Sequence, residues 1–261
     1  MVRVLIATQF HRFMKSGRTE PAILGCEDPS GMWAGDYVVK LRGSLETRES
    51  GLFREMIGSI LATHFGLGTP EPAVVIIETE LAELIARAEP AHASQMRQSV
   101  GLNFGTQLVT GFSAWPVDKS IPEAMWQAAT DIFAFDAFIQ NPDRRFGNPN
   151  LFAKGDSLLV FDHEMAFSFL LDILPSPTPW KLGTQRYLAD HVFFTKLKSK
   201  PIDLEGFARL LAGLSDSRIG DLTANVPAEW NNGVLFKIES HVRALREHGG
   251  EFVEEIRRIL V

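Results

Sequence analysis

The chain has 261 residues, which is enough for one large domain or for two lobes that each bury a core. Its formal net charge of −6 argues against a surface that coats nucleic acid, so we expect no nucleic-acid partner. A single cysteine, Cys26, excludes an internal disulfide and a cysteine-rich zinc site. Gln9, His11 and Arg12 interrupt the apolar start of the chain, which predicts neither a signal peptide nor a membrane span. We therefore expect a soluble cytoplasmic protein.

The first part of the chain has the pattern of strands around one helix. The apolar runs "AILGCE" (22–27) and "DYVVKL" (36–41) flank a stretch of turn-forming residues, which predicts a hairpin with Lys40 on its second strand. Between residues 46 and 65, apolar residues recur at the spacing of a helix face, and "AVVIIE" (73–78) then resumes as a strand. This strand-rich part extends to about residue 110.

The remainder of the chain is mainly helical. Turn formers at 111–122 predict a connection, and residues 123–139 are apolar on all sides, as expected for a central helix. The runs "NLFA" and "SLLVF" flank the turn sequence "KGD", and this hairpin ends at Asp162. Beyond residue 186 the pattern is that of amphipathic helices. We therefore predict an α+β protein with two parts, residues 1–110 and 111–261.

Four polar residues occur in the order in which kinases carry their catalytic groups along the chain. Asp143 and Asn148 have the spacing D-x-x-x-x-N of a kinase catalytic loop, in which the Asp is the base and the Asn binds metal. Asp162 follows behind the hairpin, where a second metal-binding Asp is expected, and Lys40 lies on an N-terminal strand, where a lysine contacts phosphates. Each residue alone is more often a turn, cap or surface residue. The ordered set favours a kinase.

Several segments together resemble the HipA-like kinase family, over most of the chain. The most specific are "FDAFIQNPDRRFGN" and "LLVFDHEMAF", which are similar to that family's catalytic loop and metal-binding strand. "SGRTEP", "DYVVKL" and "REMIGSILATHFGLGTPEPAVV" resemble its phosphate loop, lysine strand and glutamate helix with the strand that follows. The resemblance implies a two-lobed, protein-kinase-like fold. A small antiparallel-sheet lobe with one key helix (1–110) would bind nucleotide, and a mainly helical lobe (111–261) would be catalytic.

The resemblance also implies ATP and Mg²⁺ as cofactors and gives residues their roles. Lys40 contacts phosphates and pairs with Glu55, Asp143 orients the acceptor hydroxyl, and Asn148 and Asp162 bind magnesium.

The choice of Glu55 rests on the resemblance alone. Helical periodicity instead places Glu49 on the apolar face centred on Met56 and Ile60. Glu55 stands eleven residues before Gly66, as in the family, and we follow that correspondence.

Two further predictions concern phosphate contacts. The polar turn formed by Ser16, Gly17, Arg18 and Thr19 has backbone amides that can cradle phosphates. Its composition alone fits an ordinary surface turn equally well, and its position before the Lys40 strand favours the phosphate loop. Arg144 either neutralises phosphate or anchors the catalytic loop.

The predicted function is an ATP- and Mg²⁺-dependent kinase that acts on a hydroxyl group, and Ser or Thr of a protein is the preferred acceptor. The motifs H-R-D, D-F-G and G-x-G-x-x-G are absent, which argues against an ordinary eukaryotic-type protein kinase. Lipid or small-molecule kinases of the same fold and a nucleotide-binding pseudokinase are the alternatives. No segment of the sequence corresponds to the extra N-terminal subdomain of the family's toxin kinases, which argues against a toxin role and an antitoxin-like partner without excluding them. The acceptor stays open.

Overall fold

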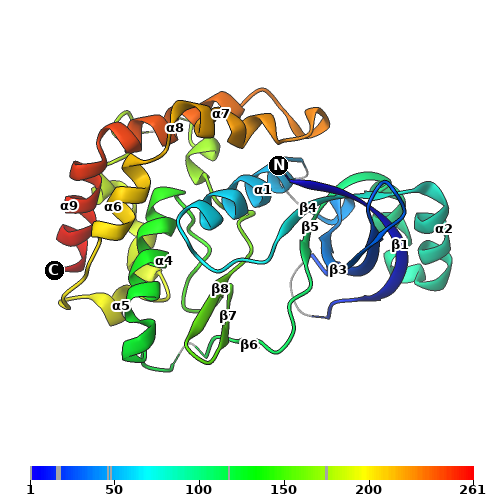
Figure 1. Cartoon of the computed structure of the whole chain (residues 1–261), viewed down its shortest axis with the longest axis horizontal. Helices are drawn as coiled ribbons and strands as arrows, with labels where there is room; N and C mark the ends of the chain where they lie inside the picture. The colour runs from blue at the N-terminus through cyan, green and yellow to red at the C-terminus, as the bar shows by residue number, and fades with distance from the viewer. Residues whose placement is uncertain (1, 16–18, 46, 48, 117, 174–175) are drawn as a thin grey trace. The chain divides into compact units, whose positions relative to one another are not determined.

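The computed structural model describes all residues except 1, 16–18, 46, 48, 117 and 174–175. The chain divides into two compact units. The first contains residues 1–56, 70–110 and 225–232, and the second contains 57–69, 111–224 and 233–261. Helix α1 (Glu49–His64) has residues in both units (Figure 1).

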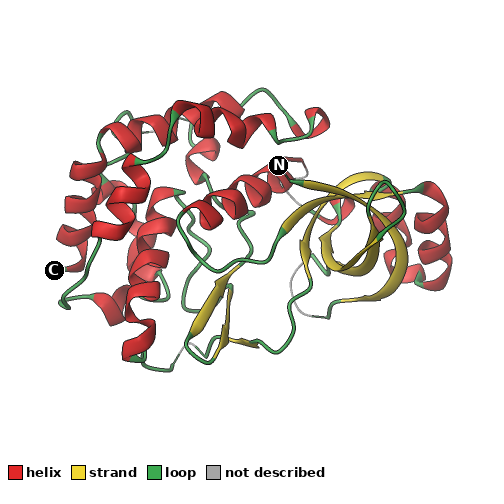
Figure 2. Ribbon diagram, in the orientation of Figure 1, coloured by secondary structure: helices red, strands yellow, loops and turns green. Residues whose placement is uncertain are grey.

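Five strands of the first unit close into a barrel (Figure 2). They are β1 (Arg3–Phe13), β2 (Ala22–Glu27), β3 (Trp33–Lys40), β4 (Pro72–Ile77) and β5 (Gly101–Gln107). The order around the barrel is β1-β2-β3-β5-β4, and β1 closes it by pairing with β4 in parallel, whereas the other neighbours are antiparallel. The predicted hairpin of β2 and β3 is confirmed. The predicted antiparallel sheet is corrected at one pair, β1–β4, which is parallel. Closure leaves these strands without a free edge.

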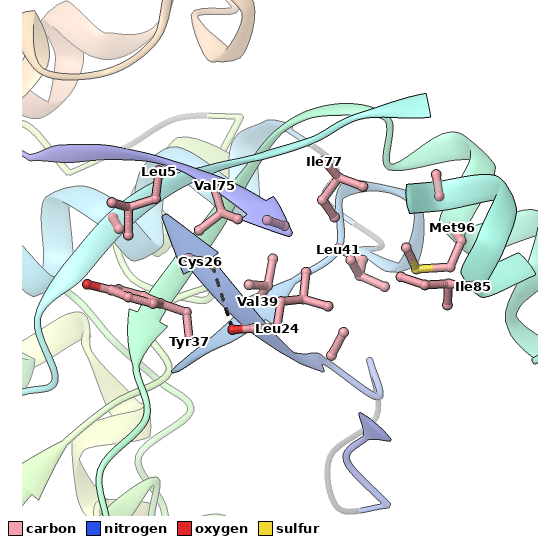
Figure 3. Close-up of a cluster of buried hydrophobic side chains, with 14 of the residues drawn as sticks. Leu5, Leu24, Cys26, Tyr37, Val39, Leu41, Val75, Ile77, Ile85 and Met96 are labelled. Carbon is pink, nitrogen blue, oxygen red and sulfur yellow. Dashed lines mark hydrogen bonds between the residues drawn. The ribbon is translucent and has the colours of Figure 1, made fainter. Parts of the chain in front are cut away.

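The barrel interior forms the core of the first unit (Figure 3). Side chains such as Leu24, Tyr37 and Val75 are fully buried and point into the cluster that the figure labels. Cys26 lies in the same cluster, and burial raises its pKa to about 12, so its thiol is chemically quiet.

Two helices that the sequence analysis did not predict extend this core. Helices α2 (Thr79–Ala88) and α3 (Ala93–Gln98) lie between β4 and β5 in the chain. Ile85 of α2 and Met96 of α3 are buried in the barrel cluster (Figure 3). The prediction of one key helix in the N-terminal part is therefore incomplete. The apolar residues of 79–98 follow a helical period, which the strand-rich surroundings obscured.

The second unit is built around helix α4 (Trp126–Phe138), which is buried from Ala129 to Phe138 except at Asp131. This confirms the prediction of a central helix. A three-stranded sheet consists of β6 (Ser113–Ala114), β7 (Leu151–Lys154) and β8 (Ser157–Val160). The β7–β8 pairing confirms the predicted hairpin.

The remaining helices of the second unit pack through aromatic side chains. Phe138 of α4 lies with its ring 5.0 Å from Phe65, and Phe65 stacks on Phe207 at 4.5 Å. Among the described residues, no helix combines the length and apolarity needed to span a bilayer. The helices that follow α4 in the second unit are α5 (Phe194–Leu197), α6 (Glu205–Ala212), α7 (Asp216–Ala224), α8 (Leu235–Glu247) and α9 (Gly249–Leu260). Short 3₁₀ turns occupy Arg42–Ser44, Pro90–His92, Glu123–Met125, Ser168–Leu171, Leu182–Thr184, Arg186–Asp190 and Ala228–Trp230.

Candidate active site

The first unit contains a buried lysine–glutamate pair. Lys40 is the last residue of β3, where β5 holds it in register opposite Phe104. Its Nζ donates a hydrogen bond to Glu55 Oε1 of α1, and the side chains are 15% and 2% exposed. The pair joins opposite charges out of water, which fixes the position of the ammonium group.

The structure pairs Lys40 with Glu55 rather than with Glu49. Every residue of α1 from Gly51 to Ser59 is buried, so no single face of this stretch is the apolar one. Periodicity therefore could not decide between the two glutamates, whereas the correspondence with the family did.

The predicted phosphate loop lies mostly outside the described residues, since these exclude Ser16, Gly17 and Arg18. Thr19 is in a turn before β2, and its carbonyl accepts a 3.4 Å hydrogen bond from Gln95 Nε2 of α3.

The loop after α4 in the second unit orients the carboxylate of Asp143. Asn148 Nδ2 and Asn150 Nδ2 donate to Asp143 Oδ2 at 2.7 and 3.2 Å, and Arg145 Nε lies 3.7 Å from Oδ1. Asn141 Oδ1 accepts from the Asp143 backbone N–H at 3.2 Å. Two amides thus hold one carboxylate oxygen, while the side chain stays 22% exposed. The carboxylate is both fixed and accessible.

Backbone geometry brings this loop to the hairpin that ends at Asp162. Arg145 and Asn148 exchange backbone hydrogen bonds of 3.1 and 2.9 Å, which closes a tight turn. Phe161 N donates to the Asn150 carbonyl at 3.2 Å. Asn150 and Asp162 have φ values of 47° and 62°, in the left-handed region that Asn and Asp tolerate better than other non-glycine residues. Such conformations concentrate at functional sites.

Electrostatics show that the two aspartates lie near each other. Burial raises the pKa of Asp143, and the negative charge of Asp162 raises it further, while the hydrogen bond from Asn150 acts against both. Two carboxylates that repel each other are relieved by a cation. Asn148 donates through Nδ2, which leaves its Oδ1 available as an oxygen donor for a cation. These oxygen donors match the preference of Mg²⁺.

Arg144 anchors the loop, which is the second of the two roles that its position in the sequence allowed. The residue is 1% exposed, so its guanidinium faces the interior. Its Nε donates to Asp136 Oδ2 of α4 at 2.6 Å, and NH1 donates to the carbonyls of Asn150 at 2.5 Å and Phe161 at 3.2 Å. A single side chain thus ties the loop that carries Asp143 to the strand end that carries Asp162. The other role, neutralising phosphate, does not fit this burial.

Asp136 and His191 complete a buried network that the sequence analysis missed. His191 Nε2 lies 3.0 Å from Asp136 Oδ2, and Asn141 Nδ2 donates to Oδ1 at 3.1 Å. Burial alone raises the pKa of Asp136, but the positive charge of Arg144 and the hydrogen bond with His191 outweigh it and lower the pKa. Burial, together with the positive charge of Arg144, lowers the pKa of His191.

A charged residue inside a helix that is apolar on all sides was the available signal for Asp136, because a buried charge requires partners. His191 lies 55 residues from Asp136 along the chain, and no local pattern marks it. Asn150 stands two residues after the predicted metal ligand Asn148 and follows Pro149, which marks it as a turn residue rather than a carboxylate partner.

A sequence profile described as HipA-like kinase matches residues 7–234. The chain belongs to the HipA-like kinase family. Among solved structures, the kinase is similar to the Helicobacter pylori proinflammatory kinase CtkA, with a TM-score of 0.56 and 11% identity over 99% of this chain and 98% of that one. At this identity the likeness concerns the fold. A comparison with curated proteins gives no match.

Family membership makes the HipA-like chain a kinase, and its fold is a mixed α/β arrangement with a strand-rich N-terminal sheet shared with another kinase. The Lys40–Glu55 pair and the loop that carries Asp143 are therefore each candidates for a role in phosphotransfer.

Proposed function

We propose that this HipA-like kinase transfers the γ-phosphoryl group of ATP, with Mg²⁺, to a hydroxyl group of Ser or Thr in a cytoplasmic protein. Residues 1–110 form the nucleotide-binding lobe and residues 111–261 the catalytic lobe. The observation that carries the proposal is the Asp143 carboxylate, which two amides orient and which lies near a second carboxylate, Asp162. Phosphoryl transfer depends mainly on such positioning and on charge stabilisation.

Asp143 accepts or orients the proton of the acceptor hydroxyl. Asn148 and Asn150 occupy Oδ2, so Oδ1 is the oxygen that faces the acceptor. Arg145 Nε, 3.7 Å from Oδ1, is 60% exposed and free to rearrange when the acceptor binds. A positioned base of this kind contributes about 10²- to 10⁴-fold in rate.

Asn148 Oδ1 and Asp162 hold the metal. Mg²⁺ held there would supply positive charge to the phosphate oxygens of ATP. Arg144 maintains the spacing between the two ligands because it binds the carbonyls of Asn150, two residues after Asn148, and of Phe161, which precedes Asp162.

Lys40 contacts the phosphates of ATP, and Glu55 holds its ammonium group in place through their ion pair. The turn of Ser16, Gly17, Arg18 and Thr19 cradles the phosphates with backbone amides, as the resemblance to the family implies.

Calorimetry with and without Mg²⁺ tests the proposal. ATP should bind the unmodified protein more tightly with Mg²⁺ than without it, and Asp162→Ala should abolish the difference. Asp156→Ala is the matched control, because Asp156 lies exposed in the turn between β7 and β8 and should leave the difference intact. Equal ATP affinity with and without Mg²⁺ in the unmodified protein counts against the metal roles. Mg-ATP binding without transfer to any lysate component favours a pseudokinase.

A further inference from the structure

The second unit contains a cavity of about 840 Å³, within the size range of ligand sites. Residues within 168–172 and 176–187 line one side, and residues of helix α8 line the other. Its lining includes Phe169, Asp172, Phe236, Lys237 and His241, together with Gln140 at the end of α4. None of the roles proposed above uses this cavity.

Gln140 is the notable group in its wall. The residue is 8% exposed and has a φ of 48°, which is uncommon for a residue with a long side chain. Within the described part of the chain, no group forms a hydrogen bond with its side-chain amide. The residue is more than nine-tenths buried on a strained backbone, but its amide atoms stay open to the cavity, where they can form hydrogen bonds with a ligand.

The cavity adjoins the proposed base. Gln140 precedes Asp143 by three residues, and three steps between consecutive Cα atoms set an upper limit of about 11 Å on their separation. The carbonyls of Ile139 and Gln140 accept hydrogen bonds from Phe167 N and Ser168 N, at 2.6 and 3.2 Å. These bonds fix the cavity wall to the start of the loop that carries Asp143. A molecule in the cavity can therefore present a neighbouring hydroxyl to Asp143.

The rest of the lining is apolar or electrically balanced. Phe169 stacks on His241 at 4.4 Å, and His241 Nε2 donates to the Phe138 carbonyl at 2.8 Å. Burial lowers the pKa of His241 to about 4, so the ring is uncharged at neutral pH. Phe236 on α8 is 62% exposed. Lys237 and Asp172 carry opposite charges, so the lining has no net charge.

We propose that this cavity binds the acceptor polypeptide through an uncharged segment next to the phosphorylated hydroxyl residue, with the Gln140 amide bonded to a peptide group. The inference rests on the proposed function and names the substrate class for it. A peptide group offers one donor and one acceptor, which match the carboxamide of Gln140. An anionic lipid headgroup or a phosphorylated small molecule is bound best by an excess of positive charge, and the lining has none. Exposed Phe236 suits an apolar side chain of the peptide.

A single introduced thiol tests the inference. Cys26 is the one cysteine of the chain and is buried, so Ser240→Cys, on the exposed side of α8 and in the cavity wall, creates one accessible thiol. The probe is a pool of synthetic peptides with a central Ser between uncharged residues. The peptides should slow the reaction of this thiol with a bulky maleimide, and the labelled protein should lose at least tenfold in phosphate transfer to the pool. Ser217→Cys on α7, also exposed and outside the lining, is the labelling control.

The outcomes separate this inference from the proposed function. The inference is overturned if labelled and unlabelled Ser240→Cys transfer phosphate to the peptide pool at the same rate. It is also overturned if the protein transfers phosphate to lipid or small molecules but to no peptide. With the first result, Mg-ATP binding leaves the proposed function standing. The second result leaves an Mg-ATP-dependent kinase but overturns its proposed Ser or Thr acceptor as well. Absence of Mg-ATP binding overturns the proposed function and the inference with it.

Two variants provide a readout without labelling. Gln140→Met keeps the length of the side chain and removes its amide, and Phe236→Ser removes the exposed ring. Each should raise KM for the peptide pool about tenfold, with the affinity for Mg-ATP unchanged. Leu84→Ser, at a similarly exposed apolar residue of the first unit, should leave KM unchanged. KM values within twofold of the unmodified protein for both cavity variants contradict the inference.

Discussion

Replacing Arg144 by lysine separates its charge from its geometry. Lys keeps the positive charge beside Asp136, but a single ammonium group cannot also reach the carbonyls of Asn150 and Phe161, which Arg144 NH1 binds at 2.5 and 3.2 Å. Hydrogen bonds to a charged group contribute about 1.5–3 kcal/mol each. The loss of two such bonds should lower the free energy of unfolding by about 3–6 kcal/mol. Arg144→Met should cost more, because it leaves the Asp136 carboxylate buried without its main partner.

Urea unfolding at pH 7 measures these losses, and transfer assays well below the melting temperature measure their effect on activity. Folded Arg144→Lys should transfer phosphate more slowly and bind Mg-ATP more weakly, since the spacing of Asn148 and Asp162 relaxes. Arg145→Lys, at the 60% exposed neighbour, is the control and should change stability by less than about 0.5 kcal/mol. Equal stability of Arg144→Lys and the unmodified protein refutes the role of the two carbonyl contacts.

Other predictions test packing and pH dependence. A Cβ at Gly58 of α1 meets His163 Cβ at 2.5 Å, so Gly58→Ala should cost about 1–3 kcal/mol in thermal or urea unfolding, whereas Gly206→Ala in α6, with no atom within 4 Å, should be neutral or stabilising. Burial raises the pKa of Asp131 from 3.8 to about 6. A shift of this size corresponds to about 3 kcal/mol in the free energy of unfolding, which solvent screening reduces to about 1 kcal/mol at this partly exposed group. Because the protonated form is favoured by folding, that stability is present below pH 4 and lost as pH rises through 6. Asp131→Asn should thus stabilise the protein at pH 7–8 and not at pH 4, and a constant gain from pH 4 to 8 contradicts the assignment.

Local patterns were sufficient for much of the second unit. The β7–β8 hairpin follows from two apolar runs around a turn sequence, and α4 follows from a helix that is apolar on all sides. Both depend on residues close in sequence, where spacing predicts structure well. The first unit was harder. Strand β1 buries only Leu5 and Ala7 among its residues, so it lacks the continuous apolar run of β4 and was not predicted.

The support of the candidate site was not predictable in the same way. Asp143, Asn148 and Asp162 have the spacing of known kinase motifs. The Asp136–Arg144–His191 network instead joins residues up to 55 positions apart. Its parts acquire meaning only when the chain folds. Glu55 shows a related limit, because burial on every side of α1 removes the periodic signal that orients a helix.

The assignment of Asp143 as the base is the central claim, and side-by-side assays of Mg-ATP affinity and phosphate transfer test it most directly. Asp143→Asn keeps the size of the side chain and removes the base, so we predict folded protein with near-normal Mg-ATP binding and transfer reduced by about 10²- to 10⁴-fold. Asp162→Asn should lose both, because it weakens the metal site, and Asp156→Asn in the exposed β7–β8 turn should lose neither. Phosphate transfer by Asp143→Asn at the rate of the unmodified protein would show that Asp143 is only a loop residue and would contradict the account.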